Sequence, residues 1–320
     1  MEPSTQNLIN RLKIRQIFQF PTTTYIENIH VRPNGHLLFT TLSSGDLYTI
    51  NPNDSNPIHS VVATLPGSTG LAGIATVDAA AGIFAVSGGE HISMGFAPGS
   101  VAVYIICIPA DSNTGVVLDR ISVDGTLNGM TSIPGTPDIV LSVDSVGGRV
   151  MRINTRTRAV DVAISDPSLG RGDSTFPIGV NGVKVRNEFL YFTNSALGTF
   201  ARFPIDAEGN KKGDVEIMAT LPDTPPGANI AYDDFDFDRD GNAYVACHSY
   251  SFLKITPGGE QSVWLGGKRE VKVDGWGFYR DVFEPMAAKL GNDGNFMYLS
   301  TGGAVIGERV QGGQILEVEL

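Results

Sequence analysis

Side chains that can transfer protons or hold polar ligands recur in short loops along this chain, each beside a short apolar segment. The loops with carboxylate, amide, hydroxyl or imidazole groups contain Glu27, Asn128, Asn181, Asp233, Asp234, His248 and Thr301. Carboxylates and imidazoles act as general acids and bases, and amides bind polar ligand atoms through hydrogen bonds. A scaffold that brings these loops together would therefore create a binding or catalytic site.

The sequence contains no motif for a nucleophilic serine and none for a cysteine-bound metal. Ser93, Ser195 and Ser249 lack the strand-to-helix turn that exposes a catalytic serine. The two cysteines, Cys107 and Cys247, have no zinc-binding spacing. Both lie in apolar, strand-like segments, so we expect buried free thiols rather than a disulfide.

Charge and composition exclude several classes of partner. The formal net charge is −11, and the longest basic clusters are pairs such as Lys211-Lys212, so we expect no nucleic-acid partner. Apolar segments stay below the length needed to span a membrane. The first residues lack the basic-then-apolar pattern of a signal peptide, so we expect a cytoplasmic location.

One pattern recurs about six times and predicts the scaffold. An apolar strand, a polar turn with Gly or Asn, a second apolar strand, a Gly/Ser-rich loop and a third strand repeat at intervals of roughly 40–55 residues, a period typical of propeller blades. The clearest copies span residues 29–50, 183–203 and 235–255, and weaker copies span 71–106, 130–153 and 297–320. Asn34-Gly35 and Asp240-Gly241 are strong hairpin signals.

These repeats predict an all-β fold, a six-bladed β-propeller with four antiparallel strands per blade, as one domain over residues 1–320. Residues 13–20 would add the outer strand to the blade formed by residues 314–320 and so close the ring. Residues 280–290 are the one predicted helix, inserted in blade six. A pair of β-sandwiches or a β-solenoid is the alternative architecture.

Two sets of loops share one end of a propeller channel, namely those that enter the first strand of each blade and those that join its second and third strands. The candidate ligand-binding residues in these loops are Glu27, Met94, Phe96, Asn128, Asn181, Tyr232, Tyr250, Trp276, Phe278 and Thr301. The aromatic and apolar members would suit a bulky apolar ligand. Alternatively, they pack an inserted segment against the rim.

The strings Ile26-Glu27-Asn28, Val180-Asn181-Gly182-Val183 and Asp233-Asp234-Phe235 carry a family resemblance. With Tyr191–Ser195 and Gly241–Ala246, they resemble the gluconolactonase/senescence-marker-protein superfamily of six-bladed propellers, especially its fungal members. The resemblance covers nearly the whole chain and is strongest in blades one, four and five.

The resemblance implies a divalent ion, often calcium, on the channel axis. Its ligands would be Glu27, Asn181 and Asp233, whose hard oxygens suit such an ion. In lactonases of this family the metal polarises the lactone carbonyl and the aspartate assists proton transfer. Alternatively, the three side chains only cap the blade starts by hydrogen bonding.

The segment that enters blade six departs from the hydrolytic pattern. Many fungal relatives have a Gly-Pro-Thr-Ser-like string there, whereas residues 273–283 of this chain are rich in aromatic side chains. The chain is similar to a fungal subgroup that catalyses hetero-Diels–Alder cycloaddition between a tropolone quinone methide and a humulene-type sesquiterpene. This similarity implies small, apolar or aromatic substrates and no required cofactor, with Asp233, Asp234, His248 and His91 as candidates for proton transfer.

Three functions therefore remain open from the sequence. The first is a hetero-Diels–Alderase, which positions two reactants and activates one by hydrogen bonds. The second is a metal-dependent lactonase or esterase, whose activity on simple lactones EDTA would abolish. The third is a non-enzymatic binding propeller, which would have a flat rim and no deep pocket.

Overall fold

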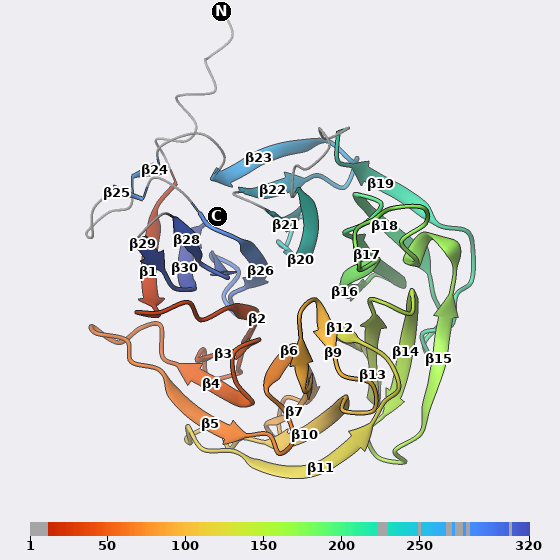
Figure 1. The fold of residues 1–320 in the computed structure, drawn as a ribbon, viewed down its shortest axis with the longest axis horizontal. Helices are drawn as coiled ribbons and strands as arrows, with labels where there is room; N and C mark the ends of the chain where they lie inside the picture. The colour runs from red at the N-terminus through yellow and green to blue at the C-terminus, as the bar shows by residue number, and fades with distance from the viewer. Residues whose placement is uncertain are drawn as a thin grey trace, which may run out of the picture.

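Six four-stranded antiparallel sheets surround a central channel in the computed structural model (Figure 1). The structure describes residues 12–222, 230–248, 251–266, 271–272, 278–279, 282–306 and 309–320. The predicted six-bladed β-propeller with four antiparallel strands per blade is confirmed.

Strands follow one another outward from the channel in blades one to five. Blade one contains β2 (Ile26–Val31), β3 (Leu37–Thr41), β4 (Asp46–Ile50) and β5 (Ser60–Thr64). Blade two contains β6 (Gly70–Asp78), β7 (Ile83–Gly89), β10 (Ala102–Cys107) and β11 (Val116–Ser122). Blade three contains β12 (Leu127–Ile133), β13 (Thr136–Asp144), β14 (Arg149–Asn154) and β15 (Val160–Ser165). Blade four contains β16 (Val180–Arg186), β17 (Phe189–Asn194), β18 (Thr199–Pro204) and β19 (Glu216–Thr220). Blade five contains β20 (Ala231–Phe237), β21 (Ala243–His248), β22 (Ser251–Ile255) and β23 (Gln261–Gly266).

Blade six joins the two ends of the chain. It contains β26 (Pro285–Leu290), β27 (Phe296–Thr301), β30 (Gln314–Glu319) and, as its outer strand, β1 (Ile14–Gln19). Ile14 lies opposite Val318 in the antiparallel pairing of β1 with β30. Arg15 and Glu317 add an ion pair with a 3.0 Å Nε–Oε1 distance. Strands from distant parts of the sequence therefore share one sheet.

Three two-stranded hairpins extend from the blades. They are β8 (His91–Ile92) with β9 (Gly95–Phe96), β24 (Val271–Lys272) with β25 (Phe278–Tyr279), and β28 (Ala304–Ile306) with β29 (Arg309–Gln311). The first projects from the β7–β10 connection of blade two, where the sequence places a candidate ligand-binding loop.

The predicted helix over residues 280–290 is wrong where the structure describes it. Residues 285–290 form β26, the innermost strand of blade six, which pairs with β27. Pro285 is tolerated because it is the first residue of that strand. The only helical segment in the described ranges is the short 3₁₀ helix η1 (Pro167–Leu169). No described helix has the length and apolar character needed to cross a bilayer.

Apolar side chains of adjacent blades pack together and form the core. Leu141 and Val143 of blade three, for example, belong to the same buried cluster as Val183 and Phe192 of blade four. Burial of apolar side chains between blades is the main favourable contribution to the free energy of folding. A single sheet would leave both of its faces in water. Both cysteines are free thiols, as expected, but only Cys247 is buried, in a cluster between blades four and five, whereas Cys107 is half-buried.

The inner strands approach one another closely at the middle of the channel. A Cβ atom on Gly73 would lie 2.3 Å from the Asn128 carbonyl oxygen, and one on Gly129 would lie 2.5 Å from the Asn181 carbonyl oxygen. A Cβ atom on Gly182 would lie 2.8 Å from the Asp234 Cα. The inner strands therefore form a narrow waist where only glycine fits.

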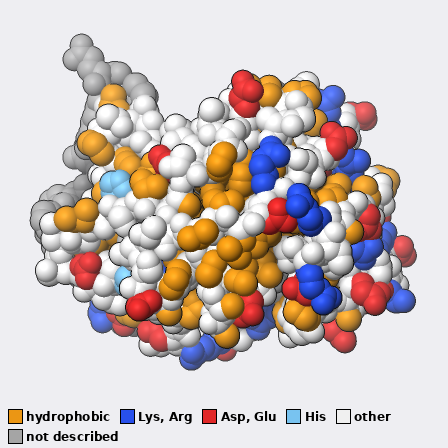
Figure 2. All heavy atoms as spheres, turned by 90° about the horizontal axis from the view of Figure 1, so that it is seen from below, with side chains coloured by type: hydrophobic (Ala, Val, Ile, Leu, Met, Phe, Trp, Pro, Cys, Tyr) orange, Lys and Arg blue, Asp and Glu red, His pale blue; other side chains and the backbone are white. Residues whose placement is uncertain are grey.

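The outer rim contains apolar side chains among mixed charges. Figure 2 views the rim from the side of β5 and β11, where hydrophobic side chains gather beside Lys, Arg, Asp and Glu. Ile58, Val61, Val116 and Leu118 are exposed there. Most residues of β5 and β11 are exposed or half-buried, because these outermost strands lie far from the packed inner part of the blades.

We expect Gly182→Ala to destabilise the propeller by about 1–3 kcal/mol, because the new methyl group must displace the Asp234 backbone. Gly258→Ala is the matched control, since a Cβ atom there meets nothing closer than the Thr256 hydroxyl at 3.8 Å. Urea unfolding monitored by circular dichroism measures both variants. Equal unfolding midpoints would refute the close contact at the waist.

Candidate functional site

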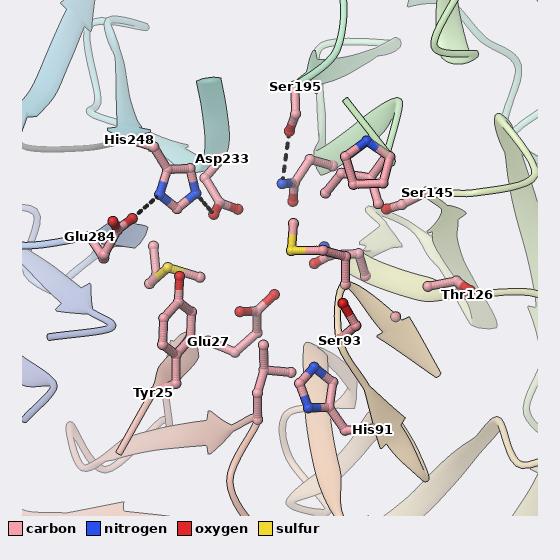
Figure 3. Close-up of a pocket in the computed structure, with 18 of the residues that line it drawn as sticks. Tyr25, Glu27, His91, Ser93, Thr126, Ser145, Ser195, Asp233, His248 and Glu284 are labelled. Carbon is pink, nitrogen blue, oxygen red and sulfur yellow. Dashed lines mark hydrogen bonds and ion pairs between the residues drawn. The ribbon is translucent and has the colours of Figure 1, made fainter. Parts of the chain in front are cut away.

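A pocket of about 650 Å³ opens at one end of the channel. Figure 3 shows side chains from several blades pointing into it. The lining residues are Thr23, Tyr25, Glu27, Leu42, Ser43, His91, Ser93, Met94, Gly95, Thr126, Asn128, Ser145, Phe176, Pro177, Ile178, Asn181, Ser195, Asp233, His248, Glu284 and Met286. Both predicted sets of loops contribute, so they do share one end of the channel.

Six of the sequence-predicted site residues line this pocket, namely Glu27, Met94, Asn128, Asn181, Asp233 and His248. Each polar member comes from the start of an inner strand or the end of a second strand. Glu27 lies in β2, Asp233 in β20, and His248 is the last residue of β21. His91 lines the pocket as well.

Four other predicted residues do not line the pocket. Tyr232 is fully buried and its hydroxyl donates to Gln261 in the outer strand of its own blade. Thr301 is fully buried and accepts a hydrogen bond from the Gln314 backbone. Phe96 is buried with its ring against His91, and Asp234 faces the waist. Successive side chains of a strand point to opposite faces, so Tyr232 and Asp234, which flank the pocket-lining Asp233, point away from the pocket.

The predicted aromatic mouth falls largely outside the described residues. Tyr250 and Trp276 lie outside them, and Phe278 is described only as part of β25, without its side chain. The apolar lining that the structure does describe comes from other residues, which include Leu42, Met94 and Ile178.

His248 is held between two carboxylates (Figure 3). Its Nε2 lies 2.7 Å from Asp233 Oδ2, and its Nδ1 lies 2.7 Å from Glu284 Oε2. Because carboxylates accept hydrogen bonds, both ring N–H groups donate and the imidazole carries a positive charge. Burial would lower the pKa of His248, but hydrogen bonds and attraction from the two carboxylates raise it to about 10.

The neighbouring acids have raised pKa values. Burial, and then repulsion from Asp233, raises the pKa of Glu27 well above its usual value, although His248 partly offsets this shift. Burial also raises the pKa of Asp233, against the opposing effect of His248. Burial and the charges of Glu27, Glu284 and Asp233 raise the pKa of Tyr25. Burial is therefore the main cause of the raised pKa values along this wall of the pocket.

Three buried oxygens of pocket-lining residues have no hydrogen-bond partner among the described residues, namely Glu27 Oε2, Asn181 Oδ1 and the hydroxyl oxygen of Ser145. The Asn181 amide is fixed by its nitrogen, which donates to Ser195 Oγ at 3.0 Å, and Ser195 in turn donates to the Tyr232 carbonyl at 2.7 Å. Unpaired buried acceptors are costly, so these oxygens are available to a cation, a water molecule or a ligand that donates hydrogen bonds.

The residues present fit a hard divalent cation in their chemistry. Glu27, Asn181 and Asp233 would hold it through carboxylate and amide oxygens. The described residues contain no group of three or more His, Cys, Asp and Glu placed as a metal site. A cation here would therefore depend on the Asn181 amide and on ligand or water oxygens. Hydroxyl groups of an organic ligand would satisfy the unpaired Glu27 and Asn181 oxygens as well.

Glu284 and Tyr25 are functional candidates that the sequence analysis missed. Glu284 immediately precedes β26 and has a left-handed backbone conformation with φ of +50°, which is unusual for a residue other than glycine. Its segment reads as helical in sequence, which hides its role. The Tyr25 ring packs against Gly302, where a Cβ atom would lie 2.5 Å from the ring, and no local motif reveals that contact.

Comparison with known proteins agrees with the fold and the resemblance. No family model matches the chain. A curated protein from Phoma sp., named "Putative hetero-Diels-Alderase", is 26% identical over 261 residues, which cover 74% of this chain and 72% of that protein. The chain is therefore similar in sequence to that Phoma protein and similar in fold to propellers of known structure.

Two solved structures illustrate the shared fold. A luciferin-regenerating enzyme matches with a TM-score of 0.66 and 14% identity, over 97% of this chain and 95% of its own. Regucalcin from Agrobacterium tumefaciens, described as a calcium-binding protein, matches with a TM-score of 0.62 and 12% identity, over 95% and 92% of the two chains. At these identities the likeness establishes the propeller fold alone.

We expect Glu284→Gln to lower the pKa of His248 by at least about one unit, because an amide replaces one of the two negative charges that stabilise the imidazolium. NMR titration of the histidine ring signals measures the effect, with His248→Gln used to assign the resonance. The wild-type ring should remain protonated through neutral pH and lose its proton near pH 10.

The same shift predicts the pH dependence of stability. A histidine pKa raised by folding stabilises the native state fully below about pH 6.5, and this contribution is lost as the pH rises through the folded-state value. Wild-type protein should therefore lose more thermal stability between pH 7 and pH 10 than Glu284→Gln. Parallel stability profiles would contradict a charged His248.

Proposed function

We propose that this protein is an enzyme that catalyses an intermolecular hetero-Diels–Alder cycloaddition. The observation that carries the proposal is a deep channel-end pocket with one polar and one apolar side. The similarity to the Phoma protein over 74% of the chain supports it. A pocket of about 650 Å³ also differs from the flat rim expected of a non-enzymatic binding module.

The polar side of the pocket comes from blades one, five and six. Tyr25, Glu27, Asp233, His248 and Glu284 lie along it. Glu27 Oε2 on this side and Asn181 Oδ1 from blade four are unpaired acceptors that suit a reactant with hydroxyl groups. An oxygenated heterodiene, such as a tropolone quinone methide with its ring hydroxyls, meets that requirement.

The apolar lining comes mainly from the loops of blades one to four. Leu42, Met94, Phe176, Pro177 and Ile178 contribute to it. These side chains make no demand for hydrogen bonds, so they suit a hydrocarbon partner such as a humulene-type alkene. The two reactants would then lie side by side, each against the surface that matches its polarity.

Positioning supplies most of the rate enhancement in this scheme. One C–C and one C–O bond form, two π bonds are consumed, and no atom leaves, so the cycloaddition balances without an oxidant or reductant. Holding two reactants in attack geometry is worth up to about 7–11 kcal/mol in ideal cases.

Glu27 can also generate the heterodiene from a hydroxymethyl precursor. Its carboxyl group would protonate the departing hydroxyl, which leaves as water, while the ring hydroxyl of the tropolone returns a proton to the carboxylate. His248 would not donate to the substrate, because both of its ring nitrogens bond to carboxylates. It would instead position Asp233 and Glu284. A bound divalent ion, if resident, would polarise a substrate oxygen.

We expect the purified protein to accelerate the coupling of a hydroxymethyl tropolone precursor with humulene, followed by liquid chromatography and mass spectrometry. Glu27→Gln should slow product formation by about 10²-fold or more, because the amide cannot transfer the proton. Glu90→Gln is the matched control, since Glu90 is exposed and does not line the pocket. Wild-type rates no higher than the uncatalysed reaction would overturn the proposal.

A metal-dependent lactonase is the second candidate, favoured by the fit of Glu27, Asn181 and Asp233 to a divalent ion. It predicts hydrolysis of simple lactones such as glucono-δ-lactone, loss of that activity with EDTA, and recovery with calcium. EDTA-insensitive cycloaddition without lactone hydrolysis would exclude it. EDTA-sensitive hydrolysis without cycloaddition would establish it and exclude the first candidate.

A further inference from the structure

A second cavity of about 480 Å³ lies at the opposite end of the channel from the pocket described above. Five inner strands, β2, β12, β16, β20 and β26, line both cavities. Glu27 of β2 and Asn181 of β16 face the first pocket, whereas His30 of β2 and Lys184 of β16 face the second. We call this second cavity the lower cavity.

The waist separates the lower cavity from the first pocket. Asn28 Nδ2 donates to Asp234 Oδ2 at 2.8 Å, and Lys184 Nζ donates to Asp234 Oδ1 at 2.6 Å. These buried contacts cross the channel between blades one, four and five. A ligand in the lower cavity would therefore not touch the reactants of the proposed cycloaddition.

Three cationic side chains line the lower cavity, and they outnumber their acidic partners. Lys184 pairs with Asp234, and the ammonium group of Lys289 lies 2.8 Å from Asp236 Oδ2. Arg186 donates instead to the backbone carbonyls of Asp238 and Arg239, both at 3.1 Å.

The guanidinium of Arg186 has no carboxylate partner among the described residues. It uses two of its five N–H donors on the two carbonyls, so three remain for a ligand. After the two lysine pairs are counted, the cavity has one surplus positive charge. The chain as a whole has a net charge of −11, which makes this surplus a local exception.

Packing against aromatic rings holds the cations of β16 in place. The Lys184 ammonium lies 5.4 Å from the centre of the Phe235 ring, and the Arg186 guanidinium lies 5.5 Å from that of Phe237. Residues two apart on one strand face the same side, so Lys184 and Arg186 both face the cavity. Such fixed side chains lose little entropy when a ligand binds.

The rest of the lining is neutral and partly apolar. Among the apolar lining residues, Pro134 is exposed and Leu290 is half-buried, whereas Ile74 and Met130 pack into the core between blades. His30 bonds to the Thr76 hydroxyl at 2.8 Å. Burial, and then the charge of Lys289, lower the pKa of His30 to about 3, so the ring is neutral at physiological pH and leaves the charge balance unchanged.

We propose that the lower cavity binds an apolar monocarboxylic acid, whose carboxylate pairs with Arg186 and whose apolar body contacts Pro134 and Leu290. One negative charge matches the one surplus positive charge. The planar guanidinium suits a carboxylate, because two parallel N–H donors can meet its two oxygens. The proposal does not depend on the reaction assigned to the first pocket.

Isothermal titration calorimetry with benzoate and benzamide tests this assignment, because the two probes share their shape and differ in charge. We expect benzoate to bind the wild-type protein with a Kd of about 1 mM or below, and benzamide to bind at least tenfold more weakly. Arg186→Gln should raise the benzoate Kd at least tenfold. Arg156→Gln, at an exposed arginine paired with Asp138, should leave it unchanged.

Arg186→Lys provides a second variant that keeps the charge but loses the planar fork, and we expect an intermediate Kd. Thermal unfolding of each variant verifies that the propeller is intact. Equal benzoate affinity in wild type and Arg186→Gln would overturn the proposal, as would equal affinity for benzoate and benzamide. Absence of benzoate binding to the wild-type protein would overturn it too.

Discussion

The close packing of the inner strands around the channel is the constraint on which the rest of the structure depends. Gly73, Gly129 and Gly182 let neighbouring strands approach until only hydrogen atoms fit between them. The waist that results divides the channel into two cavities, and the inner strands β2, β12, β16, β20 and β26 supply residues to both. Position along a strand therefore decides which cavity a residue serves, which is why Asp233 and Asp236 of β20 lie in different environments.

Burial in the first pocket shifts the pKa values of the polar residues that line it. His248 links blades five and six through Asp233 and Glu284 and keeps one positive charge among several acids. The acceptors of Glu27 and Asn181 have no partner among the described residues, so they are available to a partner that donates hydrogen bonds or positive charge. A hydroxylated reactant and a divalent ion are the two partners that fit, and they lead to different reactions on the same scaffold.

The sequence predicted the blades because hairpin turns and alternating apolar residues are local signals. It also placed Glu27, Asn181 and Asp233 in one pocket, since blade starts converge in a propeller. It failed where tertiary contacts decide the outcome. The apolar spacing of residues 282–288 imitates a helix, but pairing with β27 makes residues 285–290 a strand. For the same reason Glu284, whose role depends on His248 from another blade, left no local signal.

The central claim is that the first pocket holds an oxygenated reactant through Glu27 and Asn181. A crystal structure of the protein with tropolone bound tests it most directly. The account predicts the tropolone hydroxyl and carbonyl oxygens against the polar side, with a hydrogen bond to Glu27 or Asn181 and the ring facing the apolar lining. A metal ion between Glu27, Asn181 and Asp233, with tropolone absent from the pocket, would contradict it.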